Sequence, residues 1–309
     1  MMMKKITLLV LTCLLSILTN AQQLPQITQY MMNNYVVNPA VAGMDDYYQV
    51  RTSIRNQFVG IADAPSTTVL SMYGKKDENV GLGGVVFTDQ AGPTSRVGAS
   101  ASYTYHFPLT KDVKLALALS GGFTQFKIDK AGWNVENTND PLTQGDILVQ
   151  SVPDATFGFN LYSKKWYVGF SIPQLLTSNL DLLDNDFADK LTSEQSGNLS
   201  RHLFVLAAYK HNLNKSWTIE PSILVKSVEP VEAQMDFGIK ATYDDKLWFG
   251  TDYRTNGDIA ALVGYSIQDR YMIGYSYDVL NADLSDYSNG SHEFMIAVKF
   301  NSQSSNSVK

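Results

Sequence analysis

Histidine, cysteine and clustered carboxylates are the side chains in which catalysis or metal binding would first be sought. His292-Glu293 is followed by Phe-Met-Ile, which breaks the H-E-x-x-H spacing of a zinc enzyme. The single Cys13 excludes a disulfide framework and a cysteine-based zinc site. G-x-S-x-G and Walker sequences are absent. We therefore predict no enzymatic activity, no catalytic residue, no metal site and no cofactor, and assign no such role to His106, His202, His211 or His292.

One short acidic group could still hold a cation. Asp181, Asp184 and Asp186 lie close together in a long polar stretch, but their spacing differs from that of an EF-hand loop. Two interpretations stay open, a loop Ca²⁺ site and a solvated acidic loop, and the second is favoured.

Polar and apolar residues alternate along much of the chain. From Val97 to Phe107 every second residue is apolar, and the residues between are small or polar. A period of two predicts β-strands with one apolar and one polar face. The same period returns in 113–119, 217–226, 235–241, 271–277 and 294–300.

This period predicts an all-β chain with about fourteen strands. The alternation is weak in 66–74 and in 201–211, where Phe204 and Leu206 would face the polar side. The predicted strands are 47–55, 66–74, 79–89, 95–107, 113–127, 154–163, 166–172, 201–211, 216–226, 233–243, 246–254, 258–267, 270–278 and 292–300.

The lengths of the connections separate two all-β architectures. Every connection after an even-numbered strand is short, whereas most connections after odd-numbered strands are longer, at about 56–65, 128–153, 173–200 and 279–291. Tight turns at one end and long loops at the other are typical of an outer-membrane barrel. A soluble sandwich gives no reason for this asymmetry. The sequence therefore favours a transmembrane antiparallel β-barrel over residues 47–300, with long extracellular loops and short periplasmic turns.

In such a barrel the polar face of each strand lines the lumen and the apolar face meets lipid. Closing the first strand onto the last would bring Arg55 beside Glu293, with Asp278 facing inward from the neighbouring strand. We predict a charge cluster of these three residues at the extracellular mouth, the alternative being three independently solvated side chains. Further inward lumen charges are predicted at Arg51, Arg96, Lys114, Glu220, Asp236, Lys240, Asp252 and Arg254.

The N-terminus predicts export. Lys4 and Lys5 precede an apolar run that ends near Leu18, and small residues follow up to Ala21. This is the pattern of a cleaved signal peptide over residues 1–21, and the run is too short for a membrane anchor, which needs roughly 20 apolar residues. The mature chain would begin at Gln22 and reach the outer membrane.

Residues 22–46 differ from the rest of the chain. They are rich in amides, and prolines interrupt regular structure. Two interpretations stay open, a periplasmic leader and a plug folded into the lumen. The plug would use Gln29, Tyr30, Asn33, Asn38 and Pro39. At the other end, the Ser- and Asn-rich residues 301–309 are predicted to be a disordered tail.

Composition excludes two further classes. The chain is 44% hydrophobic and 11% aromatic, which is too apolar for an intrinsically disordered protein. A net charge of -6 does not suit a nucleic-acid binder, so no nucleic-acid partner is expected.

Several ordered stretches give the chain a family resemblance. It resembles the PorP/SprF family of outer-membrane proteins of the type IX secretion system, although Phe58 stands where a Trp would be expected. The matching stretches span nearly the whole mature chain: QYM at 29–31, NPAVAG at 38–43, RNQF at 55–58, APST at 64–67, Asp89 with AGP at 91–93, SYTYH at 102–106, IGYSYD at 273–278 and GSHE at 290–293.

The resemblance implies a non-enzymatic barrel that supports export or surface attachment of a large secreted adhesin, gliding adhesins included, by engaging its C-terminal sorting domain. It implies partners among the type IX translocon and peptidoglycan-binding periplasmic components, besides outer-membrane lipid. The long loops at 128–153 and 173–200 would be the contact surfaces. A pore for passive or selective uptake of small solutes is the alternative, although lumen charges of both signs do not favour a simple ion-selective channel. An outer-membrane lipase or protease is a third class, which the absence of a triad or dyad disfavours.

Overall fold

The structure, a computed structural model, describes residues 24, 26–130, 147–180, 197–228, 231–281 and 287–300. Nearly all of this part of the chain is β-structure, with three short 3₁₀ helices near its start, η1 (Gln29–Met31), η2 (Asn34–Val36) and η3 (Pro39–Val41). No helix in these ranges is both long enough and apolar enough to cross a bilayer.

The strands form one large antiparallel sheet and one two-stranded ladder, β8 (Asn179–Leu180) with β9 (Gly197–Asn198). The strands of the large sheet are β1 (Tyr48–Asn56), β2 (Ser66–Asp77), β3 (Val80–Ala91), β4 (Thr94–Pro108), β5 (Lys114–Asp129), β6 (Ile147–Tyr162), β7 (Trp166–Ile172), β10 (His202–Tyr209), β11 (His211–Asn212), β12 (Trp217–Val228), β13 (Val231–Tyr243), β14 (Leu247–Arg254), β15 (Ile259–Ile267), β16 (Tyr271–Val279) and β17 (Ser291–Phe300).

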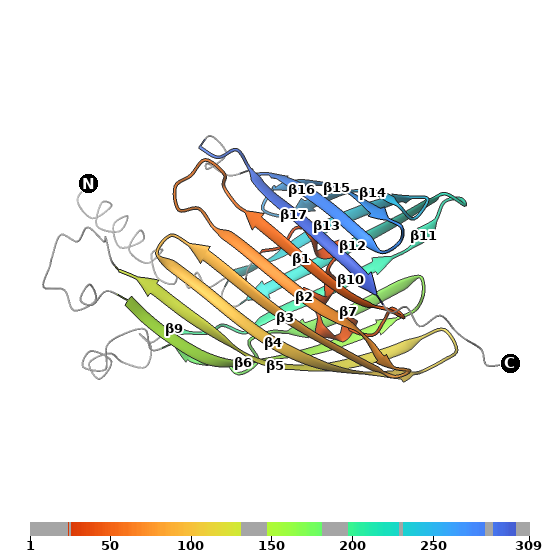
Figure 1. Ribbon diagram of the computed structural model, residues 1–309, viewed down its shortest axis with the longest axis horizontal. Coiled ribbons are helices and arrows are strands. Elements are labelled where there is room, and N and C mark those ends of the chain that lie inside the picture. The colour runs from red at the N-terminus through yellow and green to blue at the C-terminus, as the bar shows by residue number, and fades with distance from the viewer. Residues whose placement is uncertain are drawn as a thin grey trace, which may run out of the picture.

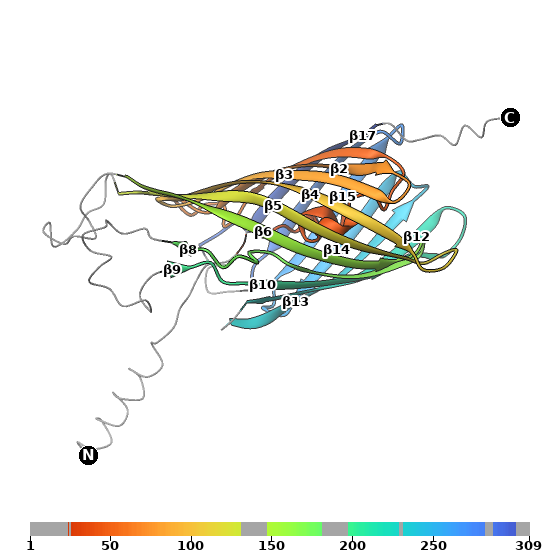
Figure 2. The same ribbon diagram turned by 90° about the horizontal axis from the view of Figure 1, so that it is seen from below.

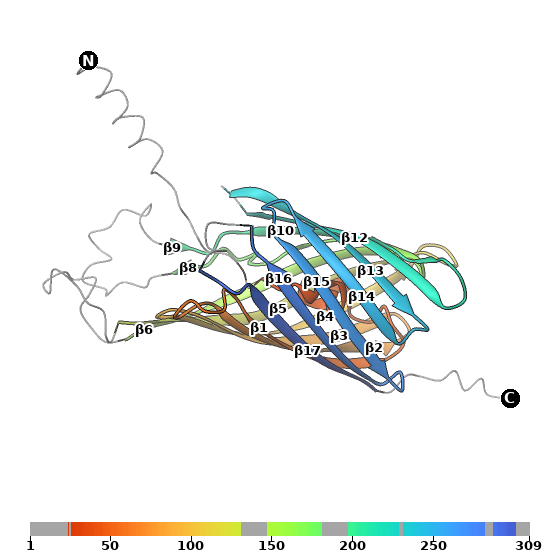
Figure 3. The same ribbon diagram turned by 90° about the horizontal axis from the view of Figure 1, so that it is seen from above.

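The large sheet is a closed barrel. Its order runs from β7 through β6 to β1, then to β17 and down to β12, and β10 pairs with both β7 and β12. The two-residue β11 also pairs with β12, so β10 and β11 together make one side of the barrel wall. Fourteen antiparallel strands therefore close on themselves in the described part of the chain, as Figures 1 and 3 show. Closure leaves no open sheet edge in a bilayer.

Alternation places the apolar side chains on the outside of the barrel. On β17, Phe294 and Ile296 are 58% and 56% exposed, whereas Met295 and Ala297, which alternate with them, are buried in the lumen. β15 and β16 alternate between exposed and covered positions in the same way. The exposed apolar surface therefore encircles the barrel, which is the surface that lipid covers in membrane barrels.

The turns at one end of the barrel are tight, and we call this the short-turn end. Asp244-Asp245 and Gln268-Asp269 all have positive φ, the backbone of a two-residue type I′ hairpin that fits the strand twist. The opposite, long-connection end carries the longer segments, which begin after Asn56, Lys130, Ile172 and Val279. Both features agree with the barrel predicted from the sequence.

One strand boundary differs from the prediction. β6 begins at Ile147 rather than at 154, so residues 147–153 of the loop predicted at 128–153 are strand. Pro153 lies within the β5–β6 ladder opposite Phe123. Phe204 and Leu206 face inward, as their place in the alternation predicted, and they pack into an apolar part of the lumen.

A segment of the chain fills part of that lumen. Residues 26–44, which we call the lumenal segment, contain the three 3₁₀ helices and lie inside the barrel (Figure 2). Tyr30 and Met31 join an apolar cluster with Leu206 and Leu224 of the wall, and Tyr35 joins a second cluster with Tyr73. The main packed core of this barrel is therefore built between the lumenal segment and the inner wall.

Candidate functional site

The three predicted charges at the long-connection end lie together. The β1–β17 register sets Arg55 directly opposite Glu293, and Asp278 faces inward from β16. The Arg55 Nη2 atom lies 2.7 Å from Asp278 Oδ2, and its Nη1 atom lies 3.7 Å from Glu293 Oε2. The side chains of both carboxylates are 0% exposed. An isolated charge at this depth would be costly, so each of these groups depends on the others.

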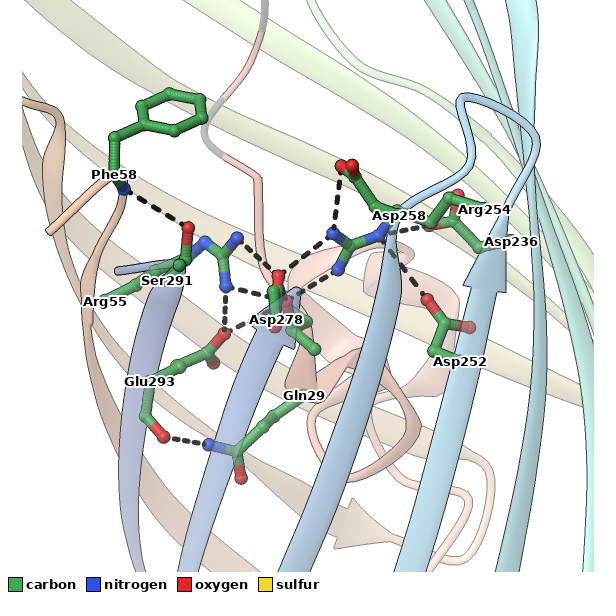
Figure 4. A network of polar contacts seen from close by, with 12 residues as sticks. Gln29, Arg55, Phe58, Asp236, Asp252, Arg254, Asp258, Asp278, Ser291 and Glu293 are labelled. Atoms are coloured by element: carbon green, nitrogen blue, oxygen red, sulfur yellow. Dashed lines mark hydrogen bonds and ion pairs between the residues drawn. The ribbon is translucent and has the colours of Figure 1, made fainter. Parts of the chain in front are cut away.

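A second arginine extends the cluster (Figure 4). Arg254 Nη1 lies 2.9 Å from Asp278 Oδ2, so Asp278 bridges two guanidinium groups. Arg254 Nε also lies 3.5 Å from Asp252 Oδ2 and 4.0 Å from Asp236 Oδ2. Lys226 Nζ then lies 2.6 Å from Asp236 Oδ2. The result is a continuous buried chain of alternating charges across β1, β17, β16, β14, β13 and β12, which we call the charged anchor.

Thr28 of the lumenal segment sits at the centre of the charged anchor. Its Oγ1 atom donates to Asp278 Oδ2 at 2.8 Å and accepts from both Arg55 Nη1 and Arg254 Nη2 at 2.7 Å. Its backbone N–H donates to Glu293 Oε2 at 2.8 Å. Sequence reasoning missed Thr28, because nothing in an uncharged stretch marks one threonine as the contact of four buried charged side chains.

The next two residues continue the attachment. Gln29 Nε2 donates to the Glu293 carbonyl at 3.0 Å, and the Tyr30 hydroxyl donates to Asp252 Oδ1 at 2.9 Å. Burial, and then the neighbouring Asp252 carboxylate, raise the pKa of Tyr30 above its ordinary value. The phenol therefore stays protonated and keeps donating.

The part of the lumenal segment nearer the short-turn end is bound by neutral groups of the wall. Asn33 Nδ2 donates to Ser71 Oγ at 3.0 Å. The Tyr35 hydroxyl bonds Ser102 Oγ at 2.8 Å, and its ring stacks on Tyr73 with centroids 4.4 Å apart. The wall groups that bind the segment thus change from charged side chains at the long-connection end to neutral groups towards the short-turn end.

η3 completes the attachment near the short-turn end. Asn38 caps it by accepting from Ala40 N at 3.0 Å and donates from Nδ2 to the Phe159 carbonyl at 2.8 Å. Pro39 occupies the first helical position, where the missing N–H costs nothing. The five predicted plug residues, Gln29, Tyr30, Asn33, Asn38 and Pro39, are therefore all buried against the wall.

Glycines of the inner wall make room for the segment. A Cβ on Gly81 would collide with the Ala42 carbonyl, and a Cβ on Gly274 would lie 2.6 Å from Gln29 Oε1. On Gly238 it would lie 2.9 Å from the Tyr30 hydroxyl. Wall and segment are thus complementary in shape as well as in hydrogen bonding.

The remaining predicted lumen charges lie apart from the anchor. Arg51 is buried and donates from Nε to Gln49 Oε1 at 2.9 Å. Lys240 Nζ lies 3.2 Å from Glu220 Oε1, Arg96 forms an ion pair with Asp89, and Lys114 is half-buried.

Two cavities lie beside the lumenal segment. A cavity of about 690 Å³ at the long-connection end is lined by Gln26, Arg55, Arg96, Arg254 and Asp258 among others. A second, of about 250 Å³, is largely apolar and includes Val37, Val69, Phe204 and Leu224 in its lining.

No group of three or more His, Cys, Asp or Glu side chains in the described ranges is placed to hold a metal ion. The acidic group at Asp181, Asp184 and Asp186 lies outside the described residues, as do the predicted signal peptide and C-terminal tail.

A closed barrel with an apolar outer belt and a polar, filled lumen defines an integral outer-membrane β-barrel protein. Within that class, the family described as type IX secretion system membrane protein PorP/SprF matches residues 19–298. The chain belongs to this family, as its sequence stretches indicated, and the family is one of secretion membrane proteins.

Comparison with solved structures returned other barrels of low sequence identity. The Ralstonia pickettii toluene transporter TbuX is 11% identical, with a TM-score of 0.49 over 87% of this chain and 92% of that one. The Acinetobacter baumannii outer membrane protein Omp33 is 9% identical, with a TM-score of 0.46 over 84% and 99%. The Pseudomonas putida toluene transporter TodX is 8% identical, with a TM-score of 0.45 over 88% and 92%. No curated protein matches the chain.

Proposed function

We propose that this protein is a non-enzymatic component of the type IX secretion system that supports export or surface attachment of a large secreted adhesin. It would do so by engaging the adhesin's C-terminal sorting domain at the long-connection end. In this proposal the chain reaches the outer membrane through a cleaved signal peptide, and the long-connection end faces outside. Translocon and peptidoglycan-binding components would be its periplasmic neighbours.

One observation carries this proposal beyond the family assignment. The lumenal segment is attached to the wall by hydrogen bonds from Thr28 to Asn38, the first of them to buried charged side chains of the wall. A barrel whose lumen is packed in this way is suited to presenting its ends to partners rather than to conducting solutes. The lumenal segment is accordingly a plug in function, held at the mouth by Arg55, Asp278 and Glu293.

A pore for small solutes is the second candidate. The cavities of about 690 and 250 Å³ beside the segment favour it, because they leave room for small molecules within the lumen. Charges of both signs line the larger cavity, which does not suit a simple ion-selective channel.

The experiment that tests the docking function is removal of the gene, followed by complementation. Surface display of a type IX adhesin is measured on whole cells by antibody binding, with total adhesin measured in lysates. We expect surface adhesin to fall while other type IX cargo is still secreted, and complementation to restore it. Unchanged display in the deletion strain would reject the proposal.

A further inference from the structure

The smaller cavity in the lumen is lined by apolar side chains of both the lumenal segment and the wall. The segment contributes Val36 and Val37, and the wall contributes Val69, Phe204 and Leu224. The volume is about 250 Å³. Apolar cavities of roughly 150 Å³ in other proteins stay dry and bind molecules of the size of benzene. The space is therefore large enough for a small organic molecule, and the segment itself builds one side of it.

A buried histidine at this cavity has a ring nitrogen without a hydrogen-bond partner. His202 of β10 is 4% exposed and is part of the cavity lining. Its Nδ1 atom lies 2.8 Å from the Ser200 carbonyl, which can only accept, so Nδ1 carries the proton. In the neutral ring Nε2 is then an acceptor, and no residue in the described part of the chain donates to it. A donor on a bound molecule would satisfy this buried nitrogen.

A second unpaired acceptor belongs to the same lining. Asp154 of β6 contributes to it, and within the described ranges the Oδ1 atom of Asp154 has no hydrogen-bond partner. β6 and β10 both pair with β7, so the two acceptors lie on strands that flank the same strand of the wall. Lys226, which also lines the cavity, forms an ion pair with Asp236 at 2.6 Å. The unpaired polar atoms of the cavity are thus acceptors, which fits a ligand that donates.

The apolar cavity adjoins the larger cavity at the long-connection end. The linings of the two cavities share Gln26, Glu232 and Gln234. A molecule that enters the larger, polar cavity of about 690 Å³ therefore meets the apolar one next to it. The adjoining cavities supply an entry path from that end of the barrel.

We propose that the apolar cavity is a binding site for a small, uncharged molecule with an apolar body and a hydrogen-bond donor, such as an indole or a phenol. The apolar side chains cover the body, and His202 Nε2 accepts a hydrogen bond from the N–H or O–H group. A molecule of the same shape without a donor leaves the histidine unpaired and binds more weakly. The inference goes beyond the docking function and does not depend on it.

Two probes of similar shape test the site. Indole has one N–H donor, whereas N-methylindole has none. Each is titrated against the whole barrel in detergent by calorimetry, with protein-free micelles as the blank. We expect indole to bind saturably and N-methylindole to bind about three- to tenfold more weakly, which is the effect of losing one hydrogen bond.

Variants test whether the probes bind in the cavity. His202→Phe removes the acceptor and should weaken indole binding by about three- to tenfold, with N-methylindole close to its parent value. His202→Gln keeps an acceptor and should restore the preference for indole. Thr156→Phe adds a ring to the cavity lining and should abolish binding of both probes. The matched control is His211→Phe, at an exposed position of β11, which should bind both probes like the parent chain.

Three results would overturn the inference. Absence of saturable indole binding to the parent chain would do so and would leave the docking function standing. Equal binding of the two probes to the parent chain would show that no hydrogen bond is made, and this comparison needs no variant to fold. Indole binding unchanged by Thr156→Phe would place the probe elsewhere.

Discussion

Thr28 is the residue on which the attachment of the lumenal segment depends most. Its hydroxyl contacts Arg55, Arg254 and Asp278, and its N–H contacts Glu293. Four buried charged side chains thus share one small neutral group. Removing a hydrogen-bond partner from a buried charge costs more than removing one from a neutral group.

Thr28→Val should therefore destabilise the folded barrel. Valine keeps the shape of threonine but leaves the two guanidinium groups and Asp278 without the hydroxyl. We expect a loss of about 2–3 kcal/mol in the free energy of unfolding, measured by urea titration in lipid vesicles. Thr28→Ser, which keeps the hydroxyl, should lose less than about 1 kcal/mol. Equal losses in the two variants would contradict the hydroxyl's role.

The bridging carboxylate gives the second prediction at this scale. Asp278→Asn removes the negative charge between two buried arginines and should cost about 3–5 kcal/mol. A matched control is Asp46→Asn, because Asp46 pairs with Lys75 but its side chain is 70% exposed. An exposed pair contributes at most about 1 kcal/mol, so the control should remain near the parent value. The same urea titration measures the loss in the free energy of unfolding for both variants. Similar losses would show that burial adds nothing to the contribution of Asp278.

At the scale of the elements, the strands could be predicted because lipid and lumen impose a period of two. Phe294 and Ile296 must face lipid, and the residues between them must not. The tight turns were equally predictable at Asp244-Asp245 and at Gln268-Asp269, because aspartate tolerates positive φ. β6 was predicted too short, because residues 147–153 were assigned to a connecting loop, whereas they pair with β5.

The contacts of the lumenal segment were less predictable. The grouping of Arg55, Asp278 and Glu293 could be predicted. The alternation along each strand shows which residues face inward, and the pairing of the first strand with the last shows which of them are neighbours. Neither rule applies to residues 26–44, whose 3₁₀ helices have no sheet register. Thr28 and the complementary glycines of the wall became visible only once the segment was placed.

Those glycines give a prediction about the fit between wall and segment. Gly81→Ala would drive a Cβ into the Ala42 carbonyl, so the segment must shift, at a cost of about 1–3 kcal/mol. Gly121→Ala is the control, because its Cβ would meet nothing within 4 Å. We expect the control to lose no stability and to gain up to about 1 kcal/mol. Thermal unfolding, followed by the band shift on gels, compares the two variants. Equal unfolding temperatures would mean that the wall and the lumenal segment are not closely packed at Gly81.

The outer face gives a prediction about lipid. Ile296 is 56% exposed near the middle of β17, so Ile296→Arg would place a charge in hydrocarbon at a cost of about 2–4 kcal/mol. Asp112→Arg adds the same side chain to an exposed turn at the barrel end and should change little. Refolding into vesicles across a urea series measures both costs. A penalty-free Ile296→Arg would argue against a lipid-facing position.

At the scale of the whole molecule, the barrel is closed and leaves no open sheet edge in the bilayer, and a segment of its own chain lies in the lumen. The lumenal segment makes hydrogen bonds to charged wall side chains near the long-connection end and packs closely against the wall further along, so the lumen is occupied over much of its length. Its partners would then meet the ends of the barrel. This separates a docking protein from a porin with the same kind of wall.

The central claim is that the lumenal segment blocks the lumen of the barrel. Electrical recording in planar lipid bilayers tests this most directly. The purified protein should insert and show no sustained open-channel current. A variant combining Thr28→Val with Gly81→Ala, which weakens the attachment at both ends of the segment, should show intermittent openings. Steady, porin-like currents from the unaltered protein would contradict the claim and favour the pore.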